Sequence, residues 1–382
     1  PRSTLFPYTT LFRSLIDKDL VRASPELFLS RHPSARGAIS FTTSGTTGTP
    51  VRIWHDRASV LANIPYGERE RQPVNELCGS FRPKEIYVGY ESSTFKKVIA
   101  FYNECSFLPV RPRRRFVPLL TPLEEVARIL DEERPDVLVG YGGWIDLFFR
   151  SAGASGLGFH RPKLVMYMGE ALPPGGREFI ESRFGIPVFS RYNAVESFKI
   201  GYYCGRRTGF HIHEDLCHIR IAGPAGESVP AGETGQVVLS NLVNRASVLL
   251  NYPMGDMAAL ASEPCPCGCT FRLMSELDGR AEDIIETADG RFIHPRAVWQ
   301  IVKEFPRVLQ YQLCELDGDA FSLTLVTASE QDFDAVSAPI VNGLTELLGE
   351  AARIAVSRSP SLPKPEGGKV RVVVARKRDS AG

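Results

Sequence analysis

Residues 41–50 read Phe-Thr-Thr-Ser-Gly-Thr-Thr-Gly-Thr-Pro, between an apolar run at 38–41 and a strand-like run at 51–54. Glycine can turn backbone N–H groups toward one point, and Ser and Thr hydroxyls add donors there, so this loop can wrap an anionic phosphate. No Lys follows the second Gly, which excludes a Walker loop. A polar hairpin turn is the alternative. The predicted phosphate-binding residues are Thr43, Ser44, Gly45, Thr46, Thr47 and Gly48.

The cysteines are a second group of residues that could carry chemistry. Three of the eight fall in the segment Cys265-Pro-Cys-Gly-Cys269. In a chain of this length, the spacing suits metal ligation better than a disulfide framework. Cysteines that are simply buried in a core are the alternative.

The elements that must position these residues follow a regular pattern from residue 121 onward. Short apolar strands alternate with amphipathic helices, which predicts a mainly parallel α/β sheet. Ligands bind beyond the carboxyl ends of such strands, where Gly169, Glu170 and residues 192–197 would fall. The expected helices are 122–133, 144–151 and 176–184, and the expected strands are 85–90, 136–139, 163–168 and 187–190.

The pattern changes after residue 201 to short β segments with Gly and Pro turns, including 236–240 and 247–250, which predicts a small β subdomain. Gly279-Arg280 resembles a joint before a separate α+β unit. We expect a large domain at 15–279 and a small domain at 280–382. Within the small domain, helices are predicted at 296–305 and 329–348, and strands at 284–286, 291–293, 309–315, 320–327 and near 354.

The N-terminal residues and the composition limit which parts of the chain belong to the natural protein and which classes of partner it can have. Residues 4–14 read as a translated sequencing adapter, so we expect residues 1–14 to be an artefact and the natural N-terminus to be missing. The balance of 45 basic and 44 acidic residues argues against a nucleic-acid partner. No apolar run approaches the ~20 residues that span a bilayer. We expect a cytoplasmic protein without a membrane partner, and a homodimer is left open.

Five motifs in order resemble the adenylate-forming (acyl-CoA synthetase) superfamily. They are the loop at 41–50, Met168-Gly-Glu-Ala171 with Tyr192-Asn-Ala-Val-Glu-Ser197, Leu250-Asn-Tyr-Pro-Met-Gly-Asp256, Gly279-Arg-Ala-Glu-Asp283, and Pro363-Lys-Pro-Glu-Gly-Gly-Lys369. The resemblance implies a large α/β domain with a β subdomain, followed by a small mobile α+β domain.

The resemblance also implies roles for individual residues. Gly169, Glu170 and Asn193 would lie beside the nucleotide, Tyr192 would stack on adenine, Glu196 would hold Mg²⁺, and Asp256 and Arg280 would bind the ribose. Lys369 would reach the cleft as the catalytic ammonium, because negative charge develops on the α-phosphate and the attacking carboxylate in the transition state.

Within the superfamily, the segments around residues 204–215 and 264–268 most resemble the phenylacetate-CoA ligase and coenzyme F390 synthetase branch. That branch implies a structural zinc ion in a closed site with no position left for water. The implied ligands are Cys204, His211, Cys265 and Cys267, with Cys269, His213 and Cys217 in reserve.

The function implied is ATP- and Mg²⁺-dependent activation of a small carboxylic acid to an acyl-adenylate, followed by transfer to coenzyme A. An aryl acid is favoured by aromatic residues around 90–95, 141–144 and 192–194. Transfer to an amine, adenylation of a phenol, and a nucleotide-binding protein without catalysis are the alternatives, the last because of Thr49, Val195 and Met254. The run at 111–115 is read as a solvated face, and His55 and His294 as structural residues without a visible partner.

Overall fold

The computed structural model describes residues 14–43, 51–90, 93–105, 113–173, 175–277, 283–287, 291–293, 295–362 and 371–376. Its main sheet has the strand order β13-β9-β8-β7-β6-β5-β3-β4. The segment from β7 to β4 is parallel, as the sequence predicts. The bounds are β3 (Lys84–Gly89), β4 (Arg113–Pro118), β5 (Val137–Gly140), β6 (Leu164–Met168), β7 (Val188–Tyr192), β8 (Gly201–Tyr202), β9 (Phe210–Ile212) and β13 (Leu273–Met274).

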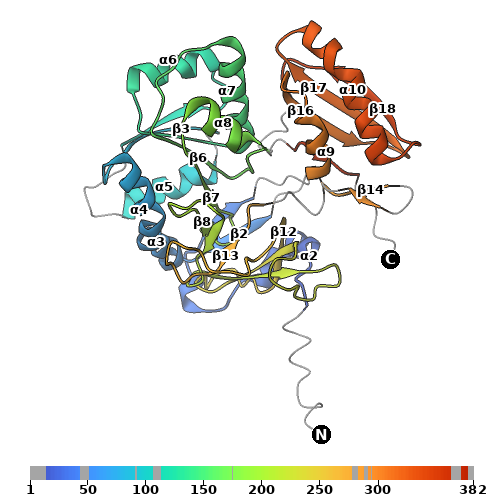
Figure 1. Ribbon diagram of the computed structural model, residues 1–382. Coiled ribbons are helices and arrows are strands. Elements are labelled where there is room, and N and C mark those ends of the chain that lie inside the picture. Colours follow the sequence, from blue (N-terminus) through green and yellow to red (C-terminus); the bar gives the residue numbers. More distant parts are fainter. Residues whose placement is uncertain are drawn as a thin grey trace.

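Alternating side chains of these strands build two cores on opposite faces of the sheet. In β3, Ile86 and Val88 pack under α6 (Leu123–Glu133), α7 (Gly142–Ser155) and α8 (Gly176–Phe184), which lie together over one face (Figure 1). Tyr87, between them, points to the other face, toward α4 (Glu68–Cys78) and the β subdomain. This period of two explains why the strands read as continuous apolar runs, since both faces are buried.

The β subdomain is a three-stranded antiparallel sheet of β10 (Cys217–Ala222), β11 (Gly235–Asn241) and β12 (Tyr252–Ala258). The predicted strand at 247–250 is wrong, because this segment forms only an isolated bridge between Ser247 and Leu29. A hairpin of β1 (Ile39–Thr42) and β2 (Arg52–His55) flanks the loop at 43–51. The remaining helices of this half are α2 (Lys18–Ala23), the 3₁₀ turns η1 (Pro25–Phe28) and η2 (Pro33–Ala35), α3 (Arg57–Tyr66) and α5 (Thr94–Cys105).

The structure describes the basic run at 111–115 from Arg113 onward, where Arg113 and Arg115 are exposed as predicted. From Arg113 onward it forms the edge strand β4, and the carboxylates of Glu85 and Glu133 neutralise it. Arg114 donates to Glu85, and Arg115 lies 2.6 Å from Glu133 Oε1. A charged edge strand also resists pairing with another sheet edge.

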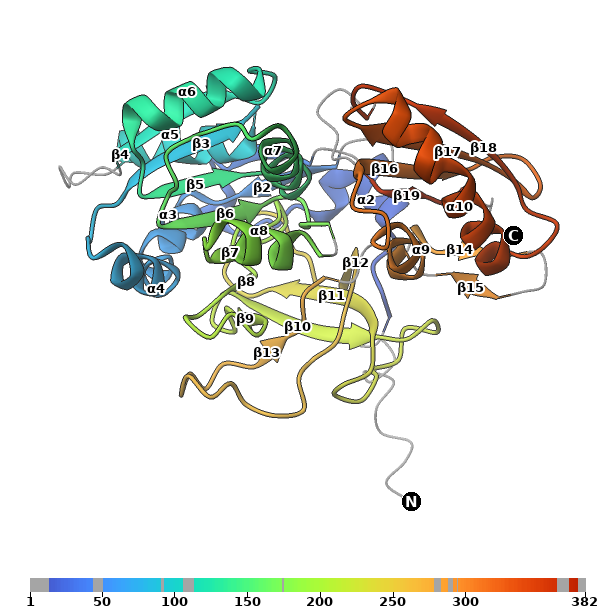
Figure 2. The same cartoon turned by 45° about the horizontal axis from the view of Figure 1, so that its top comes forward.

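The small domain has its own sheet and core beside the large domain (Figure 2). Its sheet has the order β18-β17-β16-β19, and α9 and α10 supply apolar side chains to its core. Gln310 Nε2 donates to the carbonyl of Gly143 across the two domains at 3.3 Å. The bounds are β14 (Ile285–Glu286), β15 (Phe292–Ile293), α9 (Pro295–Val302), β16 (Val308–Glu315), β17 (Ala320–Thr327), α10 (Glu330–Leu348), β18 (Arg353–Arg358) and β19 (Val373–Val374).

One buried carboxylate on α4 holds the loop that follows β7. The Glu70 side chain is 1% exposed and accepts from Lys199 Nζ at 2.8 Å, lies 3.2 Å from Arg191 Nε, and pairs with His213 Nε2 at 2.8 Å. Burial opposes ionisation, but Lys199, Arg191 and His213 outweigh it and hold the pKa of Glu70 well below its usual range. Since Arg191 precedes Tyr192 and Lys199 follows Ser197, Glu70 fixes both ends of the 192–197 loop.

None of the described helices combines the length and the apolar character that a bilayer crossing requires.

Replacing Glu70 by Gln is expected to lower the free energy of unfolding by about 3–5 kcal/mol, because the buried Lys199 and Arg191 lose their counter-charge. The control is Glu68→Gln on the same helix, whose side chain is 64% exposed and lies 3.8 Å from Arg71. That control should change the value by less than about 0.5 kcal/mol. Urea unfolding of both variants measures the difference, and equal losses would contradict the role of Glu70.

The same interaction predicts a pH dependence. The folded pKa of Glu70 lies below the unfolded one, so its contribution is complete above the unfolded value of about 4.5 and is lost as pH falls toward the folded value. Urea unfolding at pH 7 and pH 4 should therefore show a smaller acid-induced loss in Glu70→Gln than in the wild type. A loss of equal size in both proteins would argue against this assignment.

Candidate active site

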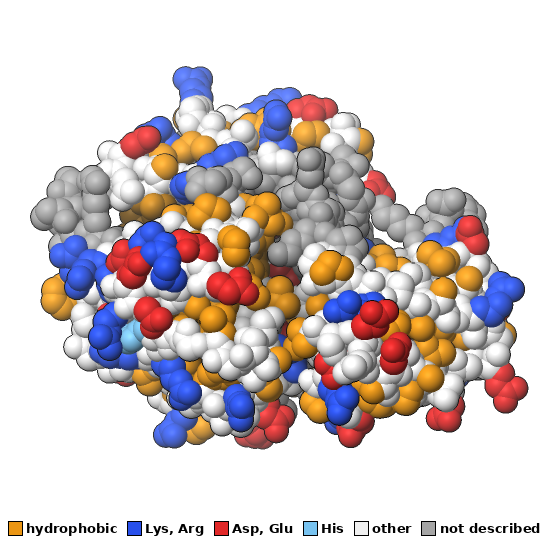
Figure 3. Space-filling view, turned by 90° about the horizontal axis from the view of Figure 1, so that it is seen from above, with side chains coloured by type: hydrophobic (Ala, Val, Ile, Leu, Met, Phe, Trp, Pro, Cys, Tyr) orange, Lys and Arg blue, Asp and Glu red, His pale blue; other side chains and the backbone are white. Residues whose placement is uncertain are grey.

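A cleft of about 350 Å³ lies between the carboxyl ends of β6 and β7 and the small domain. Hydrophobic side chains gather on both sides of this junction when the molecule is seen from above (Figure 3). The large domain contributes the loop after β6 and the start of the loop after β7, and the small domain contributes Trp299 and Tyr311. The cleft is thus at the edge of the sheet where the sequence places ligands.

The structure brings five of the predicted nucleotide-binding residues to this one cleft. They come from β6, β7 and β12 and from the loops beside them. The phenol of Tyr192 donates to Asp256 Oδ2 at 2.6 Å, which links the predicted adenine-side and ribose-side residues. These five residues are Gly169, Glu170, Tyr192, Asn193 and Asp256.

A glycine at the start of α7 allows the loop after β6 to approach. A Cβ on Gly142 would lie 2.2 Å from the backbone oxygen of Ala171, and one on Gly143 would lie 2.6 Å from Glu170 Oε1. Backbone cannot give way as a flexible side-chain tip can, so Gly142 is the more constrained position. This close approach places Glu170 in the wall of the cleft.

Glu196 does not line the cleft; it lies at the far end of the same loop and is 8% exposed. Its neighbour Tyr252 hydrogen-bonds its carboxylate, and burial together with this carboxylate raises the pKa of Tyr252. A carboxylate that is oriented by such a hydrogen bond fits a hard divalent cation such as Mg²⁺.

Thr43 lies at the neck of the predicted phosphate loop. Its backbone N–H donates to the Val51 carbonyl and its hydroxyl accepts from the Val51 N–H, each at 2.9 Å. Thr43 therefore closes the loop. The expectation that His55 lacks a partner is wrong, because its Nε2 lies 2.7 Å from the carbonyl oxygen of Val195. Outside the described residues are Ser44, Gly45, Thr46, Thr47, Gly48, Arg280, His294 and Lys369.

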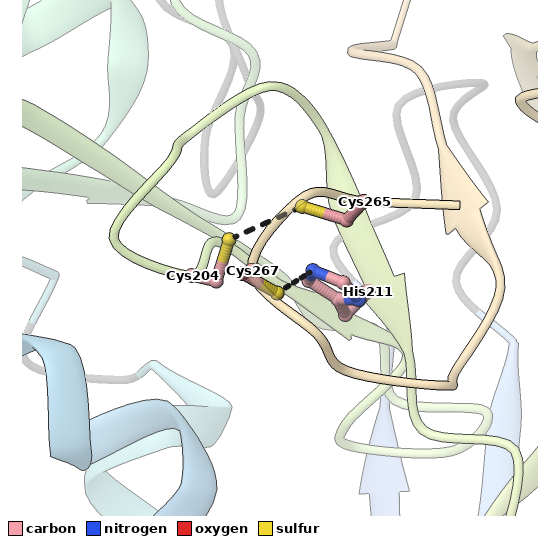
Figure 4. A group of neighbouring side chains, drawn as sticks. All are labelled: Cys204, His211, Cys265 and Cys267. Atoms are coloured by element: carbon pink, nitrogen blue, oxygen red, sulfur yellow. Dashed lines mark hydrogen bonds between the residues drawn. The ribbon is translucent and has the colours of Figure 1, made fainter. Parts of the chain in front are cut away.

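The four predicted zinc ligands converge, with their ligand atoms all within 4.8 Å of one another. Cys204 and His211 come from the strands β8 and β9 and the turn between them, and Cys265 and Cys267 from the loop before β13 (Figure 4). The Sγ atoms of Cys204 and Cys265 are 3.7 Å apart, and Cys267 Sγ lies 3.4 Å from His211 Nε2. A tetrahedron with Zn–S bonds of about 2.3 Å has S–S edges of about 3.8 Å.

Neighbouring groups also prepare these side chains for a metal. His211 Nδ1 lies 3.3 Å from the carbonyl of Phe271, which leaves Nε2 for the metal. The backbone N–H groups of Arg206 and Cys269 donate to Cys204 Sγ and Cys267 Sγ, each at 3.4 Å. Burial lowers the pKa of His211, which favours the neutral imidazole that metals bind.

The reserve ligands have other contacts. His213 pairs with Glu70, and Cys217 Sγ donates to the carbonyl of His213 at 3.6 Å. Cys269 Sγ lies 3.8 Å from the phenol oxygen of Tyr202. Among the described residues, the metal-binding group therefore consists of the four primary candidates.

The aromatic residues that the sequence predicts for the acyl pocket do not all lie together: some border the loop after β6, and Trp144 lies in the hydrophobic core. Tyr90 and Tyr141 lie 5.8 Å apart between ring centroids, and a Cβ on Gly169 would be 3.2 Å from Tyr141, so these rings border the loop after β6. Trp144 is instead buried in the core and stacks on Phe148 with ring centroids 5.4 Å apart.

The sequence reasoning missed several residues of the cleft, among them an ion pair of Asp283 and Arg371. Arg371 donates through Nε to Asp283 Oδ1 at 2.5 Å and also through Nη2. Both residues line the cleft, and the adjoining Val372 carbonyl accepts from Leu313 N–H at 2.9 Å. The only sequence signal was their position, because Asp283 ends the hinge-like motif and Arg371 follows the Lys369 loop.

No protein-family model matches the chain. A phenylacetate-coenzyme A ligase of Thermus thermophilus is 27% identical over 192 residues. This match covers 44% of this chain and 43% of the ligase, which is less than half of the length of either protein. A phenylacetate-coenzyme A ligase of Aromatoleum evansii is 21% identical over 367 residues, which cover 90% of this chain and 80% of the ligase.

Two solved structures share the fold. A 2-hydroxyisobutyryl-CoA ligase in the postadenylation state, in complex with R3-HIB-AMP, has a TM-score of 0.72 at 17% identity, and the match covers 95% of this chain and 80% of the ligase. The amide bond synthetase McbA from Marinactinospora thermotolerans has a TM-score of 0.61 at 17% identity over 88% of this chain and 67% of the synthetase. The sequence relatives and the shared fold agree with the resemblance in the motifs: the chain is similar in sequence to phenylacetate-coenzyme A ligases and has the fold of adenylate-forming ligases.

Proposed function

We propose that the protein activates a small carboxylic acid with ATP to an acyl-adenylate and then transfers the acyl group to coenzyme A. The observation that carries this proposal is the meeting of Tyr192, Asp256 and Glu170 in one cleft beneath the small domain. The similarity to two phenylacetate-coenzyme A ligases supports the reaction class.

Different residues would bind different parts of ATP. Tyr192 would offer its ring to adenine, and Asp256 would accept hydrogen bonds from the ribose hydroxyls while Tyr192 orients it. Glu196 would hold Mg²⁺, whose charge offsets that of the ATP phosphates. We assign phosphate binding to the loop that Thr43 closes, ribose binding also to Arg280, and stabilisation of the adenylation transition state to Lys369.

A second candidate is amide formation, in which an amine replaces coenzyme A as acceptor. The shared fold with an amide bond synthetase favours it. The first half-reaction is common to both, so product analysis with coenzyme A and with an amine panel distinguishes them. An aryl acid is our first choice of substrate because Tyr90 and Tyr141 border the loop after β6.

We expect acid-dependent exchange of labelled pyrophosphate into ATP when the protein is given a panel of aryl and aliphatic carboxylates. Lys369→Ala should slow this exchange by about 10²- to 10³-fold, the usual effect of removing a group that stabilises transition-state charge. Absence of exchange in the wild type across the panel would refute adenylation. Tight ATP binding that is indifferent to Lys369→Ala would favour a nucleotide-binding protein.

Asp256→Ala is expected to raise the KM for ATP by about 10- to 100-fold, because a charged hydrogen-bond acceptor of the ribose contributes about 1.5–3 kcal/mol. Asp317→Ala is the control, since Asp317 has a 90% exposed side chain on the small domain. Initial rates of pyrophosphate exchange at varied ATP concentration give both values. An unchanged KM in Asp256→Ala would contradict the ribose assignment.

We also propose that the cluster of Cys204, His211, Cys265 and Cys267 holds a structural zinc ion. The protein should contain about one zinc per chain by atomic emission spectroscopy, and Cys204→Ser should lose the metal and unfold at lower urea concentration, since metal binding contributes directly to folding. Cys269→Ser should keep it. Full zinc content in Cys204→Ser would overturn the ligand set.

A further inference from the structure

The two peptide units on either side of the Glu196 Cα are held by buried side chains from two other segments. His55 Nε2 lies 2.7 Å from the carbonyl oxygen of Val195. Asn241 Nδ2 donates to the carbonyl oxygen of Glu196 at 2.9 Å. Consecutive carbonyls of a loop are thus tied to side chains from β2 and β11.

His55 carries this contact into the β1–β2 hairpin, at the end away from the predicted phosphate loop. It is the last residue of β2, is 1% exposed, and pairs with Ile39 in the hairpin that flanks residues 43–51. Its ring packs against Phe41 and Phe198, with centroids 5.9 and 4.2 Å away. Since the partner is a carbonyl oxygen, Nε2 must carry the proton.

Asn241 is equally constrained. Its Oδ1 accepts from the backbone N–H groups of Val243 at 3.0 Å and Asn244 at 2.7 Å, which fixes the amide so that Nδ2 faces Glu196. Asn244 in turn donates to the carbonyl of Trp54 at 2.8 Å. The hydrogen bonds therefore form a closed circuit from β2 to residues 195–196, to the end of β11, and back to β2.

We propose that His55 and Asn241 are positioning residues that hold the backbone at residues 195–196 and thereby place the Glu196 carboxylate where it can bind a divalent cation. This inference rests on the proposed function. Glu196 fits the role because its carboxylate is nearly buried and hydrogen-bonded by Tyr252. A shift of the 195–196 backbone would move the carboxylate while leaving it intact.

Variants can separate positioning from packing. His55→Phe keeps an aromatic ring between Phe41 and Phe198 but has no donor, whereas His55→Gln offers an amide N–H near the position of Nε2. Asn241→Asp removes the donor to Glu196 and keeps the acceptor for Asn244. Asn63→Asp is the matched control, because Asn63 is a buried amide whose Nδ2 donates to Ser59 O at 2.7 Å within α3 rather than to the backbone at residues 195–196.

The readouts are the Kd for MgATP by isothermal titration calorimetry, the Mg²⁺ concentration for half-maximal pyrophosphate exchange, and the thermal midpoint. His55→Phe and Asn241→Asp should raise the Kd and the Mg²⁺ requirement by about 10- to 100-fold, the usual effect of losing a contact that orients a metal ligand. His55→Gln should restore both values to within about threefold of the wild type, a difference of less than about 1 kcal/mol. Asn63→Asp should lower the thermal midpoint and leave the Mg²⁺ requirement unchanged.

The inference is overturned if His55→Phe and Asn241→Asp lose only thermal stability, as Asn63→Asp does, with a wild-type Mg²⁺ requirement. If His55→Phe does not fold, the comparison of Asn241→Asp with Asn63→Asp in Mg²⁺ requirement and thermal midpoint is sufficient for the test. If the wild type exchanges pyrophosphate and the two variants have the same Mg²⁺ requirement as the wild type, the positioning role is refuted and the proposed function stands. A wild type that neither binds MgATP nor exchanges pyrophosphate refutes the proposed function, and this inference falls with it.

Discussion

The geometry of the cleft depends on the ion pairs that the buried carboxylate of Glu70 makes with Lys199 and Arg191. A charge with a 1% exposed side chain is tolerable only with compensating partners, and it has Lys199 and Arg191 within 3.2 Å. Because these partners bracket the 192–197 loop, the electrostatic requirement of Glu70 becomes a geometric restraint on Tyr192 and Glu196. Its third partner, His213, belongs to the segment after β9, next to the predicted zinc site.

The 192–197 loop is thus held at its ends by charge and in its middle by neutral hydrogen bonds. His55 and Asn241 contact the backbone at residues 195–196, and Tyr192 is tied to Asp256 on β12. Each of these restraints comes from a different element, so the loop is positioned by the large sheet, the hairpin and the β subdomain together. Support from several elements restricts how far a loop can move.

Polar groups lie beside the hydrophobic side chains where the two domains meet. Gln310 reaches the Gly143 carbonyl, and Arg371 pairs with Asp283 within the small domain at the mouth of the cleft. Asp146 Oδ1 and Tyr311 Oη are buried there without a hydrogen-bond partner among the described residues.

Much of the fold followed from the pattern of residues. The helices α6 and α8 and the strand β17 match their predicted ranges to within a residue, because apolar periodicity and turn residues are local signals. The misses have tertiary causes. The run at 113–115 has exposed side chains at Arg113 and Arg115, as predicted, but it also forms an unpredicted edge strand, in which Glu85 and Glu133 pair with Arg114 and Arg115. Residues 247–250 read as a strand but have only one bridge partner among the described residues.

By itself, the sequence determined the chemistry that is present: hydroxyls and glycines in one loop, carboxylates after strands, one Cys/His pair and one Cys/Cys pair, each a short-range pattern of residue types. It could also order these motifs along the chain. Only the tertiary structure decided which groups meet, such as Glu70 with Lys199, His55 with Val195, and Arg371 with Asp283. Those pairs are separated by 88 to 140 positions, and their contact depends on how sheets and helices pack rather than on any local pattern.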